Sequence, residues 1–212
     1  MSSAPVPRGD VASAARAPRR ARGQLRVDAL VGAAAEVFAR KGYEAATMTE
    51  IAAQSGSSIG SLYQFFRTKE AIAGAVLAAQ VDALWGLFDE LQARAPASGT
   101  EVLGREMAGF LAGFRAAHPS FALLLEAPGA SLELVGFVRR RMRERIVDVL
   151  QAHDPAAAPQ TLRAMAPAVQ QALKAGVQLH AEFAGDELSA ATGELETMLA
   201  GYLAARLRRP VA

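Results

Sequence analysis

The chain has 212 residues, half of them apolar (51%), and a formal net charge of +2. That length is enough for one large or two small domains with a substantial core. The absence of Cys excludes disulfides and thiolate metal sites. No apolar run is long enough for a secretory signal or a membrane span, so we expect a cytoplasmic protein with no membrane partner.

Positive charge gathers at the N-terminal end of the chain. Residues 1–69 hold ten Lys and Arg against five Asp and Glu, a net charge of +5. Residues 70–212 hold thirteen against sixteen, a net charge of −3. This polarity favours a phosphate-bearing partner at the N-terminal end and keeps the remainder away from it.

Residues 1–22 are rich in Ala, Pro, Ser and Arg and have almost no large apolar side chain. Because they cannot offset the entropy of ordering, we predict a disordered basic arm. Its arginines could enter a minor groove, as basic arms do. A solvated tail or a mistaken start site is the alternative. The Arg- and Ser-bearing composition also resembles a transit peptide, against which Asp10 counts.

A first amphipathic helix is predicted over residues 24–41, and two short helices should follow across a glycine turn. Thr47 and Glu50 have the S/T-x-x-E spacing of a capping box, so a helix should begin directly after Thr47. The Ser55–Gly56 pair should end it, because glycine enters the left-handed conformation without a steric cost. Ser57 or Ser58 should then cap the next helix.

The second short helix has distinct inner and outer sides. Leu62 and Phe66 stand four residues apart and face inward, whereas Ser61 and Gln64 face outward with Gly60 between their turns. Two short helices joined by a tight glycine turn form a helix-turn-helix, whose second helix enters the major groove of DNA.

The outward side chains suit contact with DNA. Ser61 and Gln64 can hydrogen-bond base edges or phosphates, Gly60 allows close backbone approach, and Tyr63 presents a phenol where a phosphate would lie. Lys69 and the positive end of the next helix can hold one phosphate together. Thr47 and Thr49 could do the same on the opposite strand.

Residues 24–80 resemble the DNA-binding domain of the TetR family of transcriptional regulators. The family signature, T-x-x-x-I-A-x-x-x-G-V-S-x-G-x-L-Y-x-[HYF]-F-x-x-K-E, is matched from Thr47 to Glu70, but Ser57 stands where an apolar residue is usual, which predicts looser packing beneath the turn. Periodicity alone would turn Ile59 inward, whereas the resemblance places it at a base-reading position, near a thymine methyl. The predicted DNA-contacting residues are Thr47, Thr49, Ser58, Ile59, Gly60, Ser61, Tyr63, Gln64 and Lys69.

The pattern stays helical beyond Lys69 and indicates no strand. Further helices are predicted at about 69–94, 100–117, 119–127, 131–153, 159–184 and 186–208. Pro167 should kink the helix over 159–184 or mark its true first turn. We therefore predict an all-α fold: the arm over residues 1–22, a three-helix helix-turn-helix domain over 23–69, and a helical ligand-binding and dimerisation domain over 70–212.

The last two predicted helices carry apolar stripes at helical spacing, and Gly176, Gly193 and Gly201 would allow close helix approach. Such stripes usually form intrachain core. In TetR-like proteins, however, the last two helices pair with those of a second copy, and a two-fold dimer lets a helix-turn-helix protein reach half-sites about 34 Å apart. The resemblance implies a homodimer interface with Val169, Leu173, Val177, His180, Leu195, Met198, Leu199 and Tyr202.

The middle helices mix aromatic, apolar and a few polar side chains, as small-ligand sites do. The resemblance implies an inducer pocket among these helices, with ordinary core as the alternative for each residue. The basic run 139–145 is interpreted as a solvated helix face, in which an acidic ligand would give Arg141 a role. The ligand-binding candidates are Trp85, Phe88, Met107, Phe110, Phe114, His118, Phe121, Phe137, Arg141, Gln171 and Gln178.

Two other functions leave weaker signals. Residues 56–60 fit G-x-S-x-G, with Ser58 as the nucleophile of a serine hydrolase, but such an elbow needs a preceding strand and the preceding sequence is helical. His118, His153 and His180 lie too far apart for a metal motif, so no metal is predicted. A purely structural protein would leave the outward polar residues unexplained.

The sequence therefore predicts a transcriptional regulator that is not an enzyme and uses no cofactor. Its predicted partners are double-stranded DNA, a second copy of itself and an unidentified small molecule. The preferred mechanism is repression at a palindromic operator, relieved when the small molecule tilts the helix that starts near Lys69. Activation, or action without an inducer, is the alternative.

Overall fold

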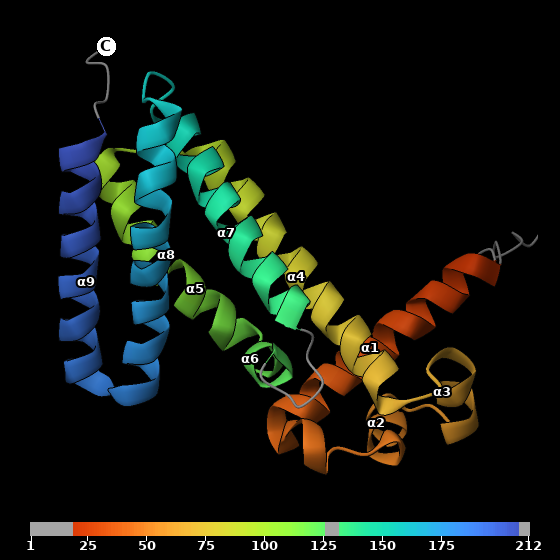
Figure 1. The fold of residues 1–212 in the computed structure, drawn as a ribbon. Coiled ribbons are helices and arrows are strands. Elements are labelled where there is room, and N and C mark those ends of the chain that lie inside the picture. The colour runs from red at the N-terminus through yellow and green to blue at the C-terminus, as the bar shows by residue number, and fades with distance from the viewer. Residues whose placement is uncertain (1–18, 126–131, 208–212) are drawn as a thin grey trace, which may run out of the picture.

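The computed structural model describes residues 19–125 and 132–207, and within these ranges all regular structure is α-helical, as predicted. Figure 1 shows a small N-terminal group of helices at one end and a larger group of long helices at the other. The helices are α1 (Arg19–Ala45), α2 (Met48–Gln54), α3 (Ile59–Phe65), α4 (Lys69–Arg94), α5 (Thr100–Ala117), α6 (Ser120–Leu125), α7 (Leu132–His153), α8 (Pro159–Glu182) and α9 (Gly185–Arg206).

The sequence pattern located most helix ends closely. α4 and α5 have the predicted bounds, and α7, α8 and α9 differ from the predicted ranges by at most two residues at either end. α1 begins at Arg19, so residues 19–22, predicted to be disordered, are helical, while residues 1–18 of the predicted arm lie outside the described residues. Pro167 lies inside α8, whose first turn is formed at Pro159.

The N-terminal helices are held together by a small apolar core. Burying side chains of this size contributes about 1.5–3 kcal/mol each, which helices as short as α2 and α3 require because their own propensity is insufficient. The fully buried members are Leu30, Val37 and Phe38 from α1, Ile51 from α2, Leu62 from α3 and Ile72 from α4.

α1 does not run straight to its end. Gly42 has φ +76° and ψ +169°, a conformation that residues with a Cβ rarely adopt. The residues after Gly42 therefore leave the helix axis, and the carbonyl groups of Tyr43 and Glu44 in α1 and of Ala46 just beyond it turn toward the start of α4.

α4 joins the two groups of helices. By length and composition it is apolar enough to cross a bilayer, with a mean hydropathy of 1.6 over its most apolar window. Gln80 and Asp82 interrupt this window, so it is not an uninterrupted apolar run. In the fold α4 packs against α1, α6 and α7, and nine of its residues are buried. A core helix passes the same compositional test.

α5, α8 and α9 pack tightly at the end of the molecule away from α3 (Figure 1). A Cβ added to Gly104 of α5 would lie 2.5 Å from the Cα of Ala200 in α9. One added to Gly176 of α8 would lie 2.7 Å from the carbonyl oxygen of Ala108 in α5. These two glycines set how closely the three helices approach one another.

Candidate DNA-reading surface and ligand cavity

Side-chain caps fix both helices of the helix-turn-helix. Thr47 Oγ1 accepts from the backbone N–H of Glu50 (3.3 Å), and the backbone N–H of Thr47 donates to Glu50 Oε2 (3.2 Å), which is the predicted capping box. Gly56 turns the chain at φ +64°. Ser58 Oγ then accepts from the N–H of Ser61 (3.2 Å), so Ser58 and not Ser57 caps α3.

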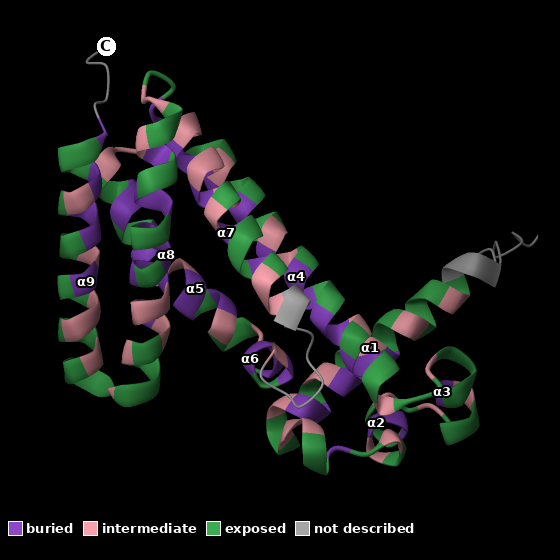
Figure 2. Cartoon of the chain, viewed as in Figure 1, coloured by how far each residue is buried: buried purple, intermediate pink, exposed green. Residues whose placement is uncertain are grey.

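α3 presents one face to the core and the other to solvent (Figure 2). Leu62 is fully buried and Phe66 packs against the same core, as predicted. Ile59 is 39% exposed, so it lies outward, where the family resemblance and not its periodicity places it. The outward surface of α3 consists of Ile59, Gly60, Tyr63, Gln64 and Phe65, with Ser61 half-buried beside them.

The two threonines at the start of α2 differ in their surroundings. The Thr47 hydroxyl accepts from the backbone N–H of Glu50 and donates to Oε2 of the same residue (3.0 Å). It is therefore both acceptor and donor within the cap. Thr47 therefore serves mainly to hold α2. Thr49 is exposed one residue inside the helix, so its hydroxyl is accessible, and its contact with DNA stays a prediction.

Lys69, for which a phosphate contact is predicted, has its ammonium engaged within the protein. Its ammonium donates to the carbonyl oxygens of Tyr43 (2.9 Å), Glu44 (3.0 Å) and Ala46 (3.2 Å), and lies 4.6 Å from the centre of the Tyr43 ring. An ammonium has three N–H donors, so all are engaged within the protein. Lys69 thereby ties the end of α1 to the start of α4.

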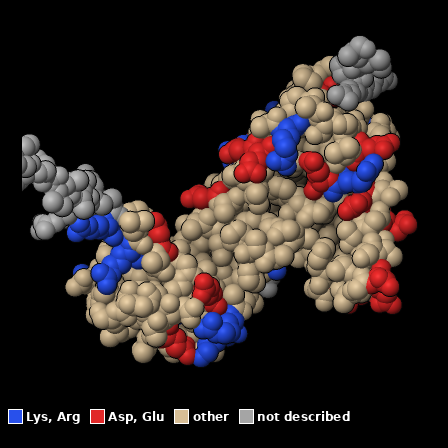
Figure 3. Space-filling model, turned by 180° about the vertical axis from the view of Figure 1, so that it is seen from behind, with Lys and Arg blue, Asp and Glu red and all other residues tan. Residues whose placement is uncertain are grey.

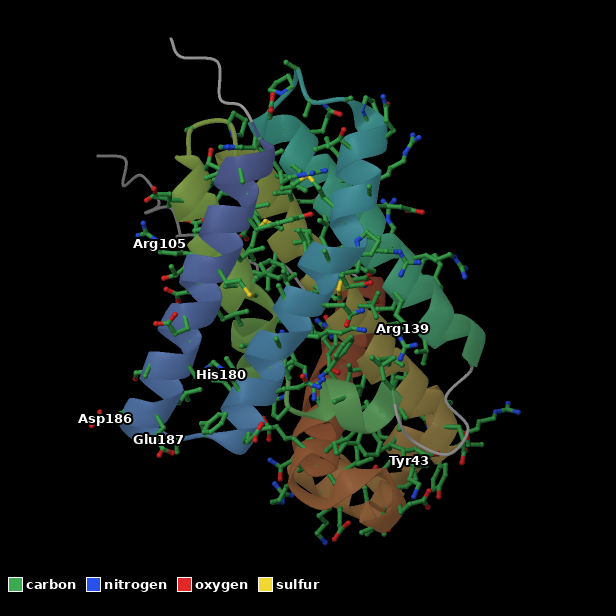
Figure 4. The ribbon with its side chains drawn as sticks, turned by 60° about the vertical axis from the view of Figure 1, so that its left-hand side comes forward. Tyr43, Arg105, Arg139, His180, Asp186 and Glu187 are labelled. Carbon is green, nitrogen blue, oxygen red and sulfur yellow. The ribbon has the colours of Figure 1, made fainter. Side chains whose placement is uncertain are left out.

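The charged groups around this tie shift one another's pKa. A hydrogen bond from Lys41 lowers the pKa of Glu50. The pKa of Glu70 is lowered by hydrogen bonds from its own backbone N–H, from the Thr68 hydroxyl and from the Tyr43 hydroxyl (3.0 Å). Burial, followed by the bond to Glu70, raises the pKa of Tyr43, which Figure 4 labels among the N-terminal helices. The carboxylates of both glutamates are thus favoured in the folded protein.

Two residues of this surface were missed by the sequence reasoning. Phe65 is 39% exposed at the end of α3, and Arg67 is exposed in the turn before α4 with no ion pair among the described residues. Phe65 occupies the signature's variable aromatic position, which was the available signal. Figure 3 shows Lys and Arg together with several Asp and Glu on the helix-turn-helix half, and Asp and Glu interspersed with Lys and Arg on the other half.

A cavity of about 850 Å³ lies among α5, α6, α7 and α8. Phe121 and Gln178 line it, as two of the predicted ligand-binding residues. The sequence reasoning missed its basic side chains, Arg115, Arg139 and Lys174, because they come from three helices far apart in the sequence. Its volume is within the range of small-molecule sites.

Most of the predicted aromatic pocket is instead protein core. Phe88 stacks between Trp85 (6.1 Å between ring centres) and Phe110 (4.5 Å), which joins α4 to α5. Phe114 packs against Phe121 and against the ring of His118, and Met107 is fully buried. Phe88, Met107 and Phe114 are buried in the core, as the ordinary-core alternative holds, whereas Trp85, Phe110 and His118 are half-buried. None of the six lines this cavity, and His118 borders a separate pocket beside α1.

The remaining ligand-binding candidates lie on the outside of the protein. Phe137 is 47% exposed, Gln171 is exposed, and Arg141 forms an exposed ion pair with Glu144 (3.0 Å). None of these three lines the cavity. Arg139 and Arg141 are both exposed, but only Arg139, two residues before Arg141 on α7, reaches the cavity wall.

The predicted dimer residues separate into two groups. Val169, Leu173, Leu195 and Leu199 are buried inside one protomer, so they pack α8 and α9 internally and cannot form the interface. Val177 lines the cavity, while His180, Met198 and Tyr202 remain at least partly exposed. Met198, at 59%, is the most exposed large apolar side chain on these two helices within the described residues.

The alternatives to DNA binding find little support in the local geometry. Ser58 follows the helix α2 and caps α3, whereas a nucleophile elbow requires a strand at that point. His153 bridges the carbonyl oxygen of Ala95 and the hydroxyl of Thr100, both at 2.9 Å, which is a structural tie between helix ends. His180 bonds the carbonyl of Gly176 in its own helix.

A capped helix-turn-helix with an exposed second helix, joined to a larger helical domain with a cavity, defines the class of DNA-binding transcriptional regulators. Comparison with known proteins agrees. Residues 30–76 match the bacterial regulatory proteins of the tetR family, and residues 101–203 match the tetracyclin repressor-like C-terminal domain. The chain belongs to the TetR family.

Individual relatives are similar over different lengths. The HTH-type transcriptional repressor KstR2 of Mycolicibacterium smegmatis is 36% identical over 85 residues, which are 40% of this chain and 42% of that protein. A TetR-like regulator from Rhodococcus sp. RHA1 has a TM-score of 0.57 and 26% identity over 88% of this chain and 97% of its own. The regulator FadR of Bacillus subtilis, solved in complex with stearoyl-CoA, shares the fold, with a TM-score of 0.55 and 17% identity over 82% of this chain and 97% of its own.

Proposed function

We propose that the protein is a cytoplasmic, homodimeric repressor that binds a palindromic operator and leaves it when a small molecule enters the C-terminal cavity. The observation that carries this proposal is the outward surface of α3. Its side chains are presented by a helix whose start is capped and whose inner face is fully buried, so the reading surface is rigid before DNA arrives.

Each outward residue suits a group on DNA. Gln64 can pair with an adenine edge, Ile59 with a thymine methyl, and Ser61 with either base edges or phosphates. Tyr63 and the hydroxyl of Ser58, whose proton the cap leaves available, suit phosphates at the flank. Gly60 has nothing within 4 Å of the place a Cβ would occupy, so the backbone there is open to the duplex.

The exposed sides of α8 and α9 support a two-fold dimer. Met198 stands between Gly193 and Gly201 on α9, and neither glycine has a neighbour within 4 Å of an added Cβ inside the protomer. Small residues around one large apolar side chain allow helices of two copies to approach closely. His180 and Tyr202 would lie at the edge of this contact. Figure 2 shows the exposed faces of both helices turned away from the remainder of the protein.

α6 provides a path from the cavity to the DNA-binding helices. Phe121 and Leu125 of α6 line the cavity, and α6 also packs against α1 and α4. Gln80 of α4 donates to the hydroxyl of Ser120 at the start of α6 (2.8 Å), in a buried position. A ligand that moves α6 would therefore shift α1 and α4 together and change the separation of the two α3 helices.

Selection of bound sequences from a random duplex pool tests the proposal. We expect an inverted repeat whose half-sites are centred about one or more helical turns apart, at about 34 Å per turn, and a complex that contains at least two protomers. Enrichment of no sequence, or a single asymmetric site bound by one protomer, would refute the dimeric repressor.

A further inference from the structure

The wall of the cavity is apolar with basic groups at one part of it. Leu111, Phe121, Val138 and Met142 contribute apolar surface, while Arg139 of α7 and Lys174 of α8 contribute positive charge, joined by Arg115 of α5. Within the described residues the lining contains no Asp or Glu. Figure 4 shows Arg139 beside α8, the helix that carries Lys174.

The basic groups of α7 and α8 disfavour one another. Burial lowers the pKa of Lys174, and the positive charges of Arg139 and Arg143 lower it further. Of the acidic residues of α7 whose side chains the structure describes, Glu144 pairs with Arg141, and Asp148 pairs with Arg145. Among the described residues, neither Arg139 nor Lys174 forms an ion pair. An anion in the cavity would relieve this repulsion.

Gln170 of α8 holds this part of the wall in place. It is 2% exposed, its Nε2 donates to the carbonyl oxygen of Arg139 (3.0 Å), and its Oε1 accepts from Arg143 (3.2 Å). The amide is therefore satisfied at both ends and fixes the α7 backbone against α8. Arg139, which is exposed, and Lys174, which is half-buried, both lie on the cavity wall, where their charges can reach an anion.

We propose that the cavity binds an amphipathic organic anion, with its carboxylate or phosphate at Arg139 and Lys174 and its apolar body against Leu111, Phe121 and Met142. This inference names the class of small molecule in the proposed function and rests on that function for its effect on DNA, but not for binding itself. Carboxylate and phosphate share the charge and acceptor oxygens that guanidinium and ammonium groups recognise.

Calorimetric titration of the full chain with three probes of equal chain length tests the proposal: dodecanoate, dodecyl phosphate and dodecanol, each below its aggregation concentration. We expect at least one anion to bind about tenfold or more tightly than the alcohol, equivalent to about 1.4 kcal/mol. The anion that binds with the higher affinity shows whether the site prefers a carboxylate or a phosphate head group. Equal affinity for the alcohol and both anions, or no binding of either anion at about 1 mM, would overturn the proposal.

A double variant, Arg139→Met with Lys174→Met, locates the anion. It should bind dodecanol as the wild-type protein does and lose the preference for the anions, whereas the control Arg141→Met on the same helix should keep it. Because like charges are removed, the double variant without ligand should melt no lower than the wild type. An unchanged preference in the double variant would place the anion elsewhere.

Operator binding in the presence of the preferred anion separates the two proposals. Release of DNA by that anion supports both. Selective anion binding without release would leave the anion site standing and refute the ligand-controlled repressor. Release of DNA at the same concentration by dodecanol as by the anions would refute the anion site alone.

Discussion

The ammonium of Lys69 lies 4.6 Å from the centre of the Tyr43 ring and donates to the carbonyl oxygen of the same residue at 2.9 Å. The pair joins the start of α4 to the end of α1. The carbonyl oxygens of Glu44 and Ala46 accept the other two hydrogen bonds of the ammonium. α3 packs against α2, which in turn packs against α1, and α4 follows α3 after a three-residue turn. We therefore expect Lys69 to affect DNA binding through the position of α1 and α4 relative to α3.

Lys69→Met keeps the alkyl chain and removes the hydrogen bonds. We expect the free energy of unfolding to fall by about 1–2 kcal/mol, and binding to weaken on every duplex. The slope of log K against log salt should not change, whereas Arg67→Met should flatten it by about one phosphate. If Lys69→Met flattened the slope as Arg67→Met does, we would conclude that the Lys69 ammonium contacts a phosphate in the DNA complex and does not stay on the three carbonyl oxygens.

Gln64→Ala and Ser61→Ala should change which sequences are preferred. Loss of a good base contact reduces discrimination by about 1–3 kcal/mol at the base pair concerned. Binding to the selected operator and to its single-base variants measures this, with Arg67→Met as the control that should weaken all of them equally. If the two variants lost equal affinity for the operator and for random DNA, Gln64 and Ser61 would not be contacting bases.

Gly104→Ala should separate α5 from α9. Its Cβ would lie 2.5 Å from the Cα and 2.7 Å from the backbone nitrogen of Ala200, and neither atom can move without the helix. We expect a loss of about 1–3 kcal/mol in urea denaturation. Gly113→Ala on the same helix has open space and should gain about 0.4–1 kcal/mol. Similar stability of the two variants would contradict the close packing.

Stability at acid pH should depend on Glu50. Because its folded pKa is lower than the ordinary 4.5, its contribution is fully present above about pH 4.5 and is lost as the pH falls through the lowered value. The thermal midpoint should therefore fall less between about pH 5 and pH 3 in Glu50→Gln than in the wild type. Glu194→Gln, at an exposed position of α9, is the control and should follow the wild-type curve.

Met198→Glu should prevent dimerisation, since it places a charge at the centre of the proposed interface. Sedimentation equilibrium should show monomers that bind one half-site weakly. Leu87→Glu, at a 36% exposed position of α4, is the control and should remain dimeric. A Met198→Glu protein that is still dimeric would move the interface away from this face of α9.

Local sequence signals were enough to predict the helix ends. Which residues line the cavity, and which apolar stripes are buried, depends on contacts between residues far apart in the sequence. The caps at Thr47 and Ser58 each involve residues three apart, so spacing alone reveals them. An apolar stripe such as Leu195 and Leu199 does not reveal which helix packs against it. In this fold α5 packs against α9, and both leucines are buried within one protomer. Likewise Arg139 and Lys174 share a wall only because α7 packs on α8.

The left-handed backbone at Gly42 has a genetic consequence. Any other residue there would strain the bend that aims three carbonyl groups at one ammonium. We therefore expect a screen for loss of operator binding to recover substitutions at position 42, because they disturb the bend that holds the start of α4.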